Sequence, residues 1–497
     1  MSSDTINENK IYEPRILSGR RVLLSSYQTI TDENVVAFVK SVENQHNINA
    51  AEIDYLYQYY KGIQPIIYRD KPVRPEIKNI VIENRANEIV SFKTGYLMGE
   101  PVSYVARTDD DKIVKNVEKL NSFVFNEDKS SLDKELADWM HIAGVGYRIC
   151  LPDKSYVDDS STAVDESPFE LTVLDPRNTA VVRRNDLTHS VLAGLIIVPA
   201  VDNAEKITYV YTDDKMYTIV GSQIKKIDKN ATGMVPIVEY PANTARIGAF
   251  EIVLPLLDAI NNVDSNRLDS VEQVVQSLLL FHNVDISNDG YDQMREQGAI
   301  KFRDLDATLK AEIKYITADI SQTETQVLTD HLYDTILTIC GMPNRNGGSS
   351  TSDTGSAVIM RDGWSAAEAR AKDTELMFKR AEKQTIKLML TICDAVSRLD
   401  LKLSDIDVRF TRRNYENIQG KAQVLTQMLN CESIPPRLAF EQSNMFVDVE
   451  NAYQQYLEYR DYRESKKQEE VLNGDQTDNR GDSVSDGTSD SKDPSEG

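Results

Sequence analysis

The chain has 497 residues, of which 40% are hydrophobic and 27% are charged, and its formal net charge is −23. This length predicts roughly three domain-sized units, and this composition is typical of a globular protein with a packed core. No window approaches the ~18 consecutive apolar residues that a membrane span requires, and the polar start MSSDTINENK lacks the layout of a secretion signal. We therefore expect a protein that stays in the cytoplasm where it is made, with no membrane partner.

The acidity argues against a surface that grips nucleic acid, because nucleic-acid-binding proteins usually carry a basic footprint. From Val471 to Gly497, six Asp and one Glu outnumber one Arg and one Lys, so this end carries −5 and the rest of the chain −18. Any contact with DNA should therefore be loose.

The chain shows no pattern of a metal or catalytic site. Its four cysteines form no CxxC pair, so we expect buried, reduced thiols, and its five histidines form no HxH or HExxH pair. Asp109-Asp110-Asp111 has no further acid at a chelating spacing and is interpreted as an exposed turn. We predict no catalytic residues, no metal and no cofactor. A metal-dependent nuclease, the enzymatic alternative, would need clustered Asp, Glu and His.

The first half of the chain predicts helices followed by short strands, which indicates an α+β unit. Residues up to Thr31 are predicted to be a weakly structured arm. Apolar spacing then predicts helices and alternation predicts strands. The helices are expected at 32–42, 77–94 and 132–143, and the strands at 102–106, 147–151, 170–174, 179–183, 190–199, 206–211, 216–220 and 237–240.

The second half predicts long helices around a small insert. The first runs over 250–282, about 50 Å, and the insert has strands at 299–302 and 312–316. A returning helix opens at Ser321, a polar loop follows Gly341, and a helix of about 65 Å covers 356–399 with a kink at Gly363. A strand at 407–411 and helices at 417–429 and 447–460 complete the prediction, with a disordered acidic tail from about 464.

Such long helices exceed a compact domain and need a partner surface. A coiled-coil dimer is one explanation, but the apolar spacing is not a sustained heptad. The other is a projecting hairpin that packs against identical hairpins in a closed ring, which makes a tube.

Four stretches of sequence resemble the portal proteins of tailed double-stranded-DNA bacteriophages, of the siphophage type. They occur in the family's order over most of residues 50–400, although TGSA stands where the family has SG-x-A and the match is loose past about 413. The stretches are Tyr59-Tyr60-Lys61-Gly62 with Asn84 and Thr94 to Val102, Gly233 to Tyr240, Leu256 to Asn261 with Ser265, and Gly341-Met342-Pro343 with Thr354 to Ala357.

The resemblance implies a portal-like α+β fold of named regions. These are an N-terminal arm (1–30), an α/β wing (31–247), two stem helices (248–282 and 321–341), a small α/β clip (283–320), a tunnel loop (342–355), a long kinked wing helix and strand (356–412), a helical crown (413–463) and a disordered acidic tail (464–497).

The resemblance also implies a function without enzymatic activity. The chain would form a ring of twelve subunits at one capsid vertex of the virion, assembled in the host cytoplasm. It would conduct double-stranded DNA during packaging and ejection, and its partners would include the terminase large subunit, head-completion or adaptor proteins, and the major capsid and scaffold proteins. A non-portal scaffolding protein built on long helices is the structural alternative, although the strand-rich half argues against it.

Two groups of residues are candidate contact sites. A tunnel loop with one base suits weak, evenly spread DNA contact, and its candidates are Asn344, Arg345, Asn346, Ser349, Ser350 and Ser352. An ordinary surface loop is the alternative. A basic cluster in the clip could dock the packaging motor, or be a solvated surface beside Asp304, Asp306 and Glu312; it consists of Arg295, Lys301, Arg303, Lys310 and Lys314.

Overall fold

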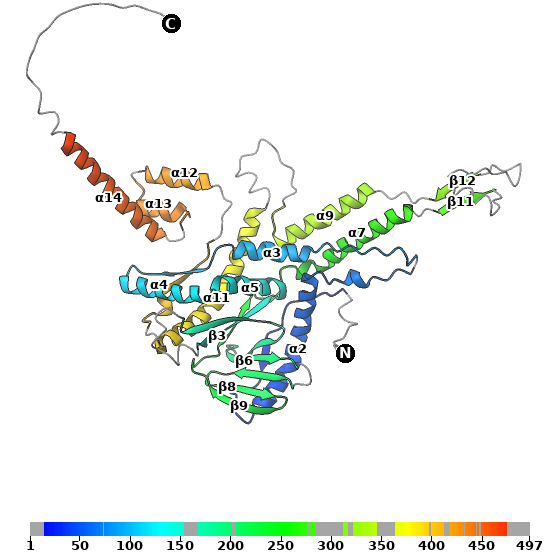
Figure 1. The fold of residues 1–497 in the computed structure, drawn as a ribbon, viewed down its shortest axis with the longest axis horizontal. Helices are drawn as coiled ribbons and strands as arrows, with labels where there is room; N and C mark the ends of the chain where they lie inside the picture. Colours follow the sequence, from blue (N-terminus) through cyan, green and yellow to red (C-terminus); the bar gives the residue numbers. More distant parts are fainter. Residues whose placement is uncertain are drawn as a thin grey trace, which may run out of the picture. The chain divides into compact units, whose positions relative to one another are not determined.

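A computed structural model describes most of the chain as two compact units, residues 1–413 and 414–497, rather than three. The described residues are 14–72, 74–153, 167–200, 205–275, 278–283, 312–316, 322–344, 363–396, 399–411, 418–431, 433–443, 445–446 and 449–474. The larger unit mixes helices with four sheets and confirms the predicted α+β class (Figure 1).

A six-stranded sheet in the order β1-β5-β6-β7-β8-β9 forms one part of the larger unit. Its strands are β1 (Leu23–Ser25), β5 (Thr179–Arg184), β6 (Val191–Val198), β7 (Ile207–Tyr211), β8 (Lys215–Val220) and β9 (Gln223–Lys229). Helix α2 (Val35–Tyr60) packs on it through an apolar cluster that includes Phe38, Val182 and Tyr217.

The six-stranded sheet corrects the prediction of a weakly structured arm. Residues 23–25 form β1, which pairs in parallel with β5. Two side chains of α2 hold this short strand and its flank, because Gln45 and Asn49 hydrogen-bond the backbone of Leu24 and Arg21. Such tertiary contacts leave no periodic signal in the sequence. Strand β9 was also not predicted.

A three-stranded sheet, in the order β10-β3-β4, forms the second part. It consists of β3 (Val145–Pro152), β4 (Phe169–Leu174) and β10 (Ile237–Pro241), with α5 (Lys129–Ala143) and α11 (Trp364–Val396) packed against it. A two-stranded sheet pairs β2 (Ser103–Ala106) with β13 (Ile406–Arg409). Gly144, at φ 80°, ends α5 and allows the chain to enter β3 at once.

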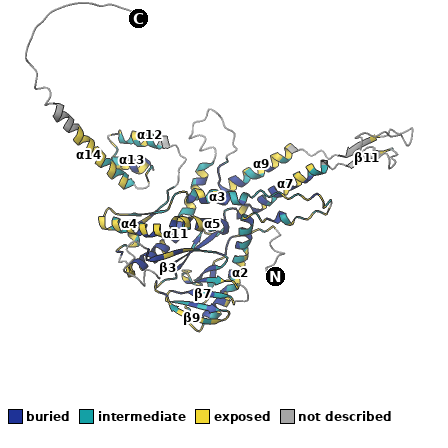
Figure 2. Cartoon of the chain, in the orientation of Figure 1, coloured by how far each residue is buried: buried dark blue, intermediate teal, exposed yellow. Residues whose placement is uncertain are grey.

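A buried ion network connects this sheet to α11. Glu382 of α11 is fully buried and pairs with Lys129 at 2.9 Å and with Arg148 at 3.3 Å. Asp133 forms ion pairs with the same two cations. The hydroxyls of Tyr104 and Tyr240 donate to Glu382, so β2 and β10 join the network. Figure 2 shows that β3 is largely buried.

Several predicted helices have different limits in the structure. Helix α3 (Arg85–Leu97) begins only after its cap Asn84, whose side chain accepts from Asn87 N, so residues 77–84 are not helical. Helix α11 begins at Trp364, immediately after Gly363 at φ 83°. A left-handed residue cannot continue an α-helix, so Gly363 interrupts the predicted helix at the expected position. The rest of the predicted helix, 356–362, lies outside the described residues.

Helix α4 (Asp111–Asn126) was not predicted, although it packs on α5 and β2. The side chain of Asp110 accepts from Lys112 N at 2.9 Å, so this residue of the acidic run caps α4. Residues 65–68 form a short 3-10 helix, η1 (Pro65–Tyr68). The described residues contain no group of three or more His, Cys, Asp or Glu that could hold a metal ion.

The smaller unit contains α12 (Ile418–Leu429), α13 (Pro436–Ser443) and α14 (Val449–Gly474). Phe440 is its aromatic centre and packs against Phe446, Tyr453 and Tyr456. Helix α14 continues to Gly474, so the predicted start of a disordered tail at 464 is wrong. The expectation of buried thiols holds for Cys150, Cys340 and Cys393 but not for Cys431, which is exposed.

Candidate functional site: the helical hairpin and its base

Two antiparallel helices form a hairpin in the larger unit. Helix α7 (Leu254–Val275) runs out and α9 (Gln322–Cys340) returns beside it (Figure 1). The single predicted helix over 250–282 is wrong at its end, because residues 278–282 form β11 (Leu278–His282), which pairs with β12 (Glu312–Ile316). At 1.5 Å per residue, the 22 residues of α7 span about 33 Å rather than 50 Å.

Apolar packing at the body end holds the two helices together. Leu257 and Ile260 of α7 share a buried cluster with Ile336 and Leu337 of α9. Met342, directly after α9, belongs to the same cluster. Farther out the contacts are polar, and Arg267 donates to Gln326 at 2.6 Å. No helix in the described part of the chain is both long and apolar enough to cross a membrane.

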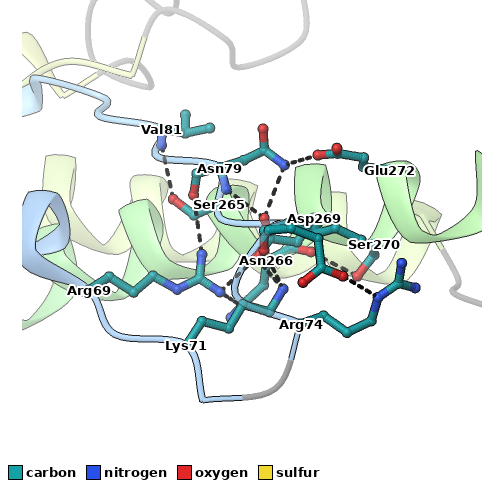
Figure 3. A network of polar contacts seen from close by, with 12 residues as sticks. Arg69, Lys71, Arg74, Asn79, Val81, Ser265, Asn266, Asp269, Ser270 and Glu272 are labelled. Carbon is teal, nitrogen blue, oxygen red and sulfur yellow. Dashed lines mark hydrogen bonds and ion pairs between the residues drawn. The ribbon is translucent and has the colours of Figure 1, made fainter. Parts of the chain in front are cut away.

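A polar network holds a segment of the body, residues 69–72 and 74–81, against α7 (Figure 3). Its centre is Asp269, which accepts from Arg69 at 2.9 Å, Lys71 at 2.8 Å and the backbone of Asn79 at 2.7 Å. Burial alone would disfavour the charged carboxylate. The hydrogen bonds from Lys71 and Asn79, with the charge of Arg69, outweigh that cost and hold the pKa of Asp269 at about 2.

Residues from separate sequence motifs meet on α7 one to two helical turns closer to the body than Asp269. Asn261 and Ser265 of α7 are fully buried, and their side chains accept from Glu83 N at 2.9 Å and Val81 N at 3.0 Å. Asn261 also donates to Gln64. Here Asn84 donates to the carbonyl of Tyr60 at 2.9 Å. We call this set, Tyr60, Gln64, Asn84, Asn261 and Ser265, the hairpin junction.

The hairpin junction explains why polar residues occur at these positions in the motifs. A buried side-chain amide or hydroxyl is stable only when it is hydrogen-bonded. The backbone of residues 81–83, which lies outside any helix or strand, supplies the donors for α7. The hairpin therefore leaves the body at a position set by directional hydrogen bonds as well as by apolar packing.

A carboxyl group beside the junction is sensitive to pH. Asp264 of α7 lies against Glu83, and Thr329 of α9 donates to it at 3.4 Å. Burial and the proximity of Glu83 raise the pKa of Asp264 to about 6, although Arg267 partly opposes this shift. Glu83 itself pairs with Arg85 at 2.7 Å. The charged form of Asp264 is thus unfavourable where the body, α7 and α9 meet.

We expect Asp264→Asn to hold the hairpin more firmly at pH 7. A pKa raised from 3.8 to about 6 means that the stability from protonation is present below about pH 4 and lost as pH rises through 6. After allowance for solvent, the gain should be about 1 kcal/mol, or roughly fivefold slower amide exchange in α7. Hydrogen exchange of wild type should slow similarly between pH 7 and pH 5, after correction for intrinsic rates. Equal corrected rates for variant and wild type at pH 7 would contradict this assignment.

The predicted contact residues are placed only in part. The side chain of Asn344 donates to Asp334 of α9 at 2.9 Å, so this residue lies at the end of the hairpin. Lys314 lies on β12, opposite Leu280 of β11. The remaining candidates lie outside the described residues; they are Arg345, Asn346, Ser349, Ser350, Ser352, Arg295, Lys301, Arg303 and Lys310.

The sequence comparison agrees with the arrangement of the motifs. The family model described as "Phage portal protein, SPP1 Gp6-like" matches residues 39–467. This match covers most of the chain, so the chain belongs to the family of phage portal proteins. It is a portal protein, the head-tail connector component of a virion, and its family is a structural one. A comparison with curated protein sequences gave no match.

The comparison with solved structures found chains from gene transfer agent particles. A chain from the neck of an empty particle is 10% identical, with a TM-score of 0.45 over 73% of this chain and 90% of that chain. A chain from the virion of a native particle is 11% identical, with a TM-score of 0.46 over 80% and 94%.

Proposed function

We propose that identical copies of this chain close into a ring of twelve, with the α7–α9 hairpins side by side as the wall of an axial channel. The observation that carries this proposal is apolar exposure on both helices. Leu268 and Val271 of α7 are 45% and 46% exposed, and Val327 of α9 is 63% exposed. Several exposed apolar side chains on one projecting element are typical of an interaction surface.

The channel would conduct double-stranded DNA during packaging and ejection. The family membership supports this role, and an acidic chain suits a conduit because few basic contacts retain the DNA. In this proposal residues 248–282 and 321–341 form the stem, 283–320 the clip and 342–355 the tunnel loop. The arm (1–30), the wing (31–247 with 356–412), the crown (413–463) and the tail (464–497) would complete the subunit.

The clip would dock the terminase large subunit during packaging and head-completion or adaptor proteins afterwards. The basic residues Arg295, Lys301, Arg303, Lys310 and Lys314 are the candidates for motor docking. Contacts with the major capsid and scaffold proteins would fix the ring at one capsid vertex.

Negative-stain microscopy with mass measurement tests the ring. We expect annular particles with a central opening and a mass near twelve times 56.1 kDa. A purified chain that stays monomeric at micromolar concentration under assembly conditions would exclude this function.

We expect a change of about twofold or more in the rate of DNA packaging, with ring assembly unaltered, when four loop residues are replaced by Ala: Arg345, Ser349, Ser350 and Ser352. The expected effect is modest because these side chains would contact DNA phosphates only weakly. The matched control replaces Arg480, Ser483, Ser485 and Ser489, which have the same chemistry near the C-terminus. An in vitro packaging assay measures the effect. Loss of the ring, or an equal effect in the control, would contradict the proposal that this loop contacts DNA.

A further inference from the structure

A cleft of about 780 Å³ lies in the larger unit, away from the hairpin. It is lined by β1, β5 and β6 of the six-stranded sheet, by β10 of the three-stranded sheet and by α11. Its apolar lining includes Val181, Ile237 and Leu388, each at most 3% exposed. The proposed ring and channel do not account for this cleft.

Four arginines line the same cleft, which is unexpected in a chain with a net charge of −23. Arg183 and Arg246 share one carboxylate, that of Glu239, at 2.9 and 3.1 Å. Glu239 is buried, and although burial opposes its ionisation, the two guanidinium groups hold its pKa below the usual range. One carboxylate therefore orients two cations.

The other two arginines form no ion pair with a described residue, although the charge of Arg184 acts on the nearby carboxylate of Asp186. Arg184 donates to neutral acceptors, the carbonyls of Gln28 and Val191 at 2.9 Å and the hydroxyl of Ser190 at 3.0 Å. Arg380 of α11 is exposed and forms no ion pair with a described residue.

Asp213 and Glu239 are the acidic residues among those that line the cleft, so the lining has an excess of two positive charges, one of which is offset by Asp186 beside Arg184. The neighbouring surface of α11 extends this excess. Lys383 and Lys387 are exposed one and two turns beyond Arg380, whereas Glu382 points into the core. A basic ridge thus borders a cleft with an apolar floor.

We propose that this arginine cleft binds an acidic polypeptide segment of a second copy of the chain. The proposal rests on the ring proposed above, and it adds a subunit contact separate from the hairpin. Charge complementarity favours an identical copy, because each copy carries an excess of acidic side chains. The apolar floor favours a polypeptide, whose side chains it can bury, over a phosphodiester backbone.

The test uses Arg380→Glu in the full chain, because this exposed side chain can change without loss of an internal ion pair. We expect the concentration for half-assembly to rise roughly tenfold, measured by mass photometry over a dilution series. Arg380→Lys keeps the charge and should assemble like wild type. Arg107→Glu is the matched control, since Arg107 is exposed and does not line the cleft.

Assembly of Arg380→Glu at the wild-type concentration, with wild-type rings intact, would overturn the docking role and leave the ring proposal standing. An equal defect in Arg107→Glu would also overturn it, because the effect would then report net charge. The docking role would likewise be overturned if Arg380→Glu assembled normally but retained less DNA, because the cleft would then bind phosphate groups of DNA. A wild-type chain that forms no ring would reject both proposals.

Discussion

Glu382→Ala should destabilise the larger unit by about 3–5 kcal/mol, the range expected when a buried ion pair loses one partner. Glu382 is fully buried and accepts from Lys129, Arg148 and two tyrosine hydroxyls. Its removal leaves two buried cations with Asp133 as their shared carboxylate. Urea unfolding followed by tryptophan fluorescence measures the change, since Trp139 lies on α5 and Trp364 begins α11.

The control for this prediction is Asp394→Ala on the same helix. Asp394 is exposed, so its replacement should change stability by no more than about 0.5 kcal/mol. Lowering the pH should reduce the stability of the wild-type protein in the same way as Glu382→Ala does. Burial opposes the charge of Glu382, but Lys129 and Arg148 hold its pKa well below the usual value of 4.5. Its stabilising contribution is therefore present in full above about pH 4.5 and is lost as pH falls from there through the folded-state pKa of about 2. A Glu382→Ala variant within 1 kcal/mol of wild type would contradict the network's importance.

Placing Asp at both Leu268 and Val327 should abolish ring assembly while leaving the subunit folded. These side chains are 45% and 63% exposed on α7 and α9, so an isolated subunit loses little apolar burial. In the ring each would be buried against a neighbour, at about 1 kcal/mol or more per side chain. Burying two unpaired carboxylates costs more still. We expect the half-assembly concentration to rise about 100-fold or more, measured by sedimentation velocity and negative-stain microscopy.

The matched control places Asp at Val198 and Ile227, which are 40% and 43% exposed on β6 and β9 of the six-stranded sheet and do not line the arginine cleft. The same two charges there should leave the rings unchanged. Rings formed by the hairpin variant at wild-type concentration would show that the exposed apolar residues of α7 and α9 do not form the subunit contact. A variant whose thermal unfolding is markedly shifted would instead indicate a folding defect, and Leu268→Ser with Val327→Ser would then replace it.

Periodicity alone predicted most elements of the larger unit and the α+β class. The strands at 179–183 and 216–220 coincide closely with β5 and β8, because β-branched and aromatic residues favour a pleated, at least half-buried sheet. The hairpin was predicted, but its first helix was predicted too long. Leu278–His282 is an apolar run directly after α7, and such a run is compatible with helix or strand. Pairing with β12 makes it a strand.

The sequence by itself determined the α+β class and the order of most helices and strands around a projecting hairpin. It also determined the family, through motifs whose polar residues meet at the hairpin junction. Only the tertiary structure decided which distant residues share a site. Asn261 meets Gln64, Glu382 meets Lys129, and Arg380 lines the same cleft as Arg183. The physical reason is that periodicity records which face of an element is buried, whereas pairing across 200 residues depends on how those faces pack.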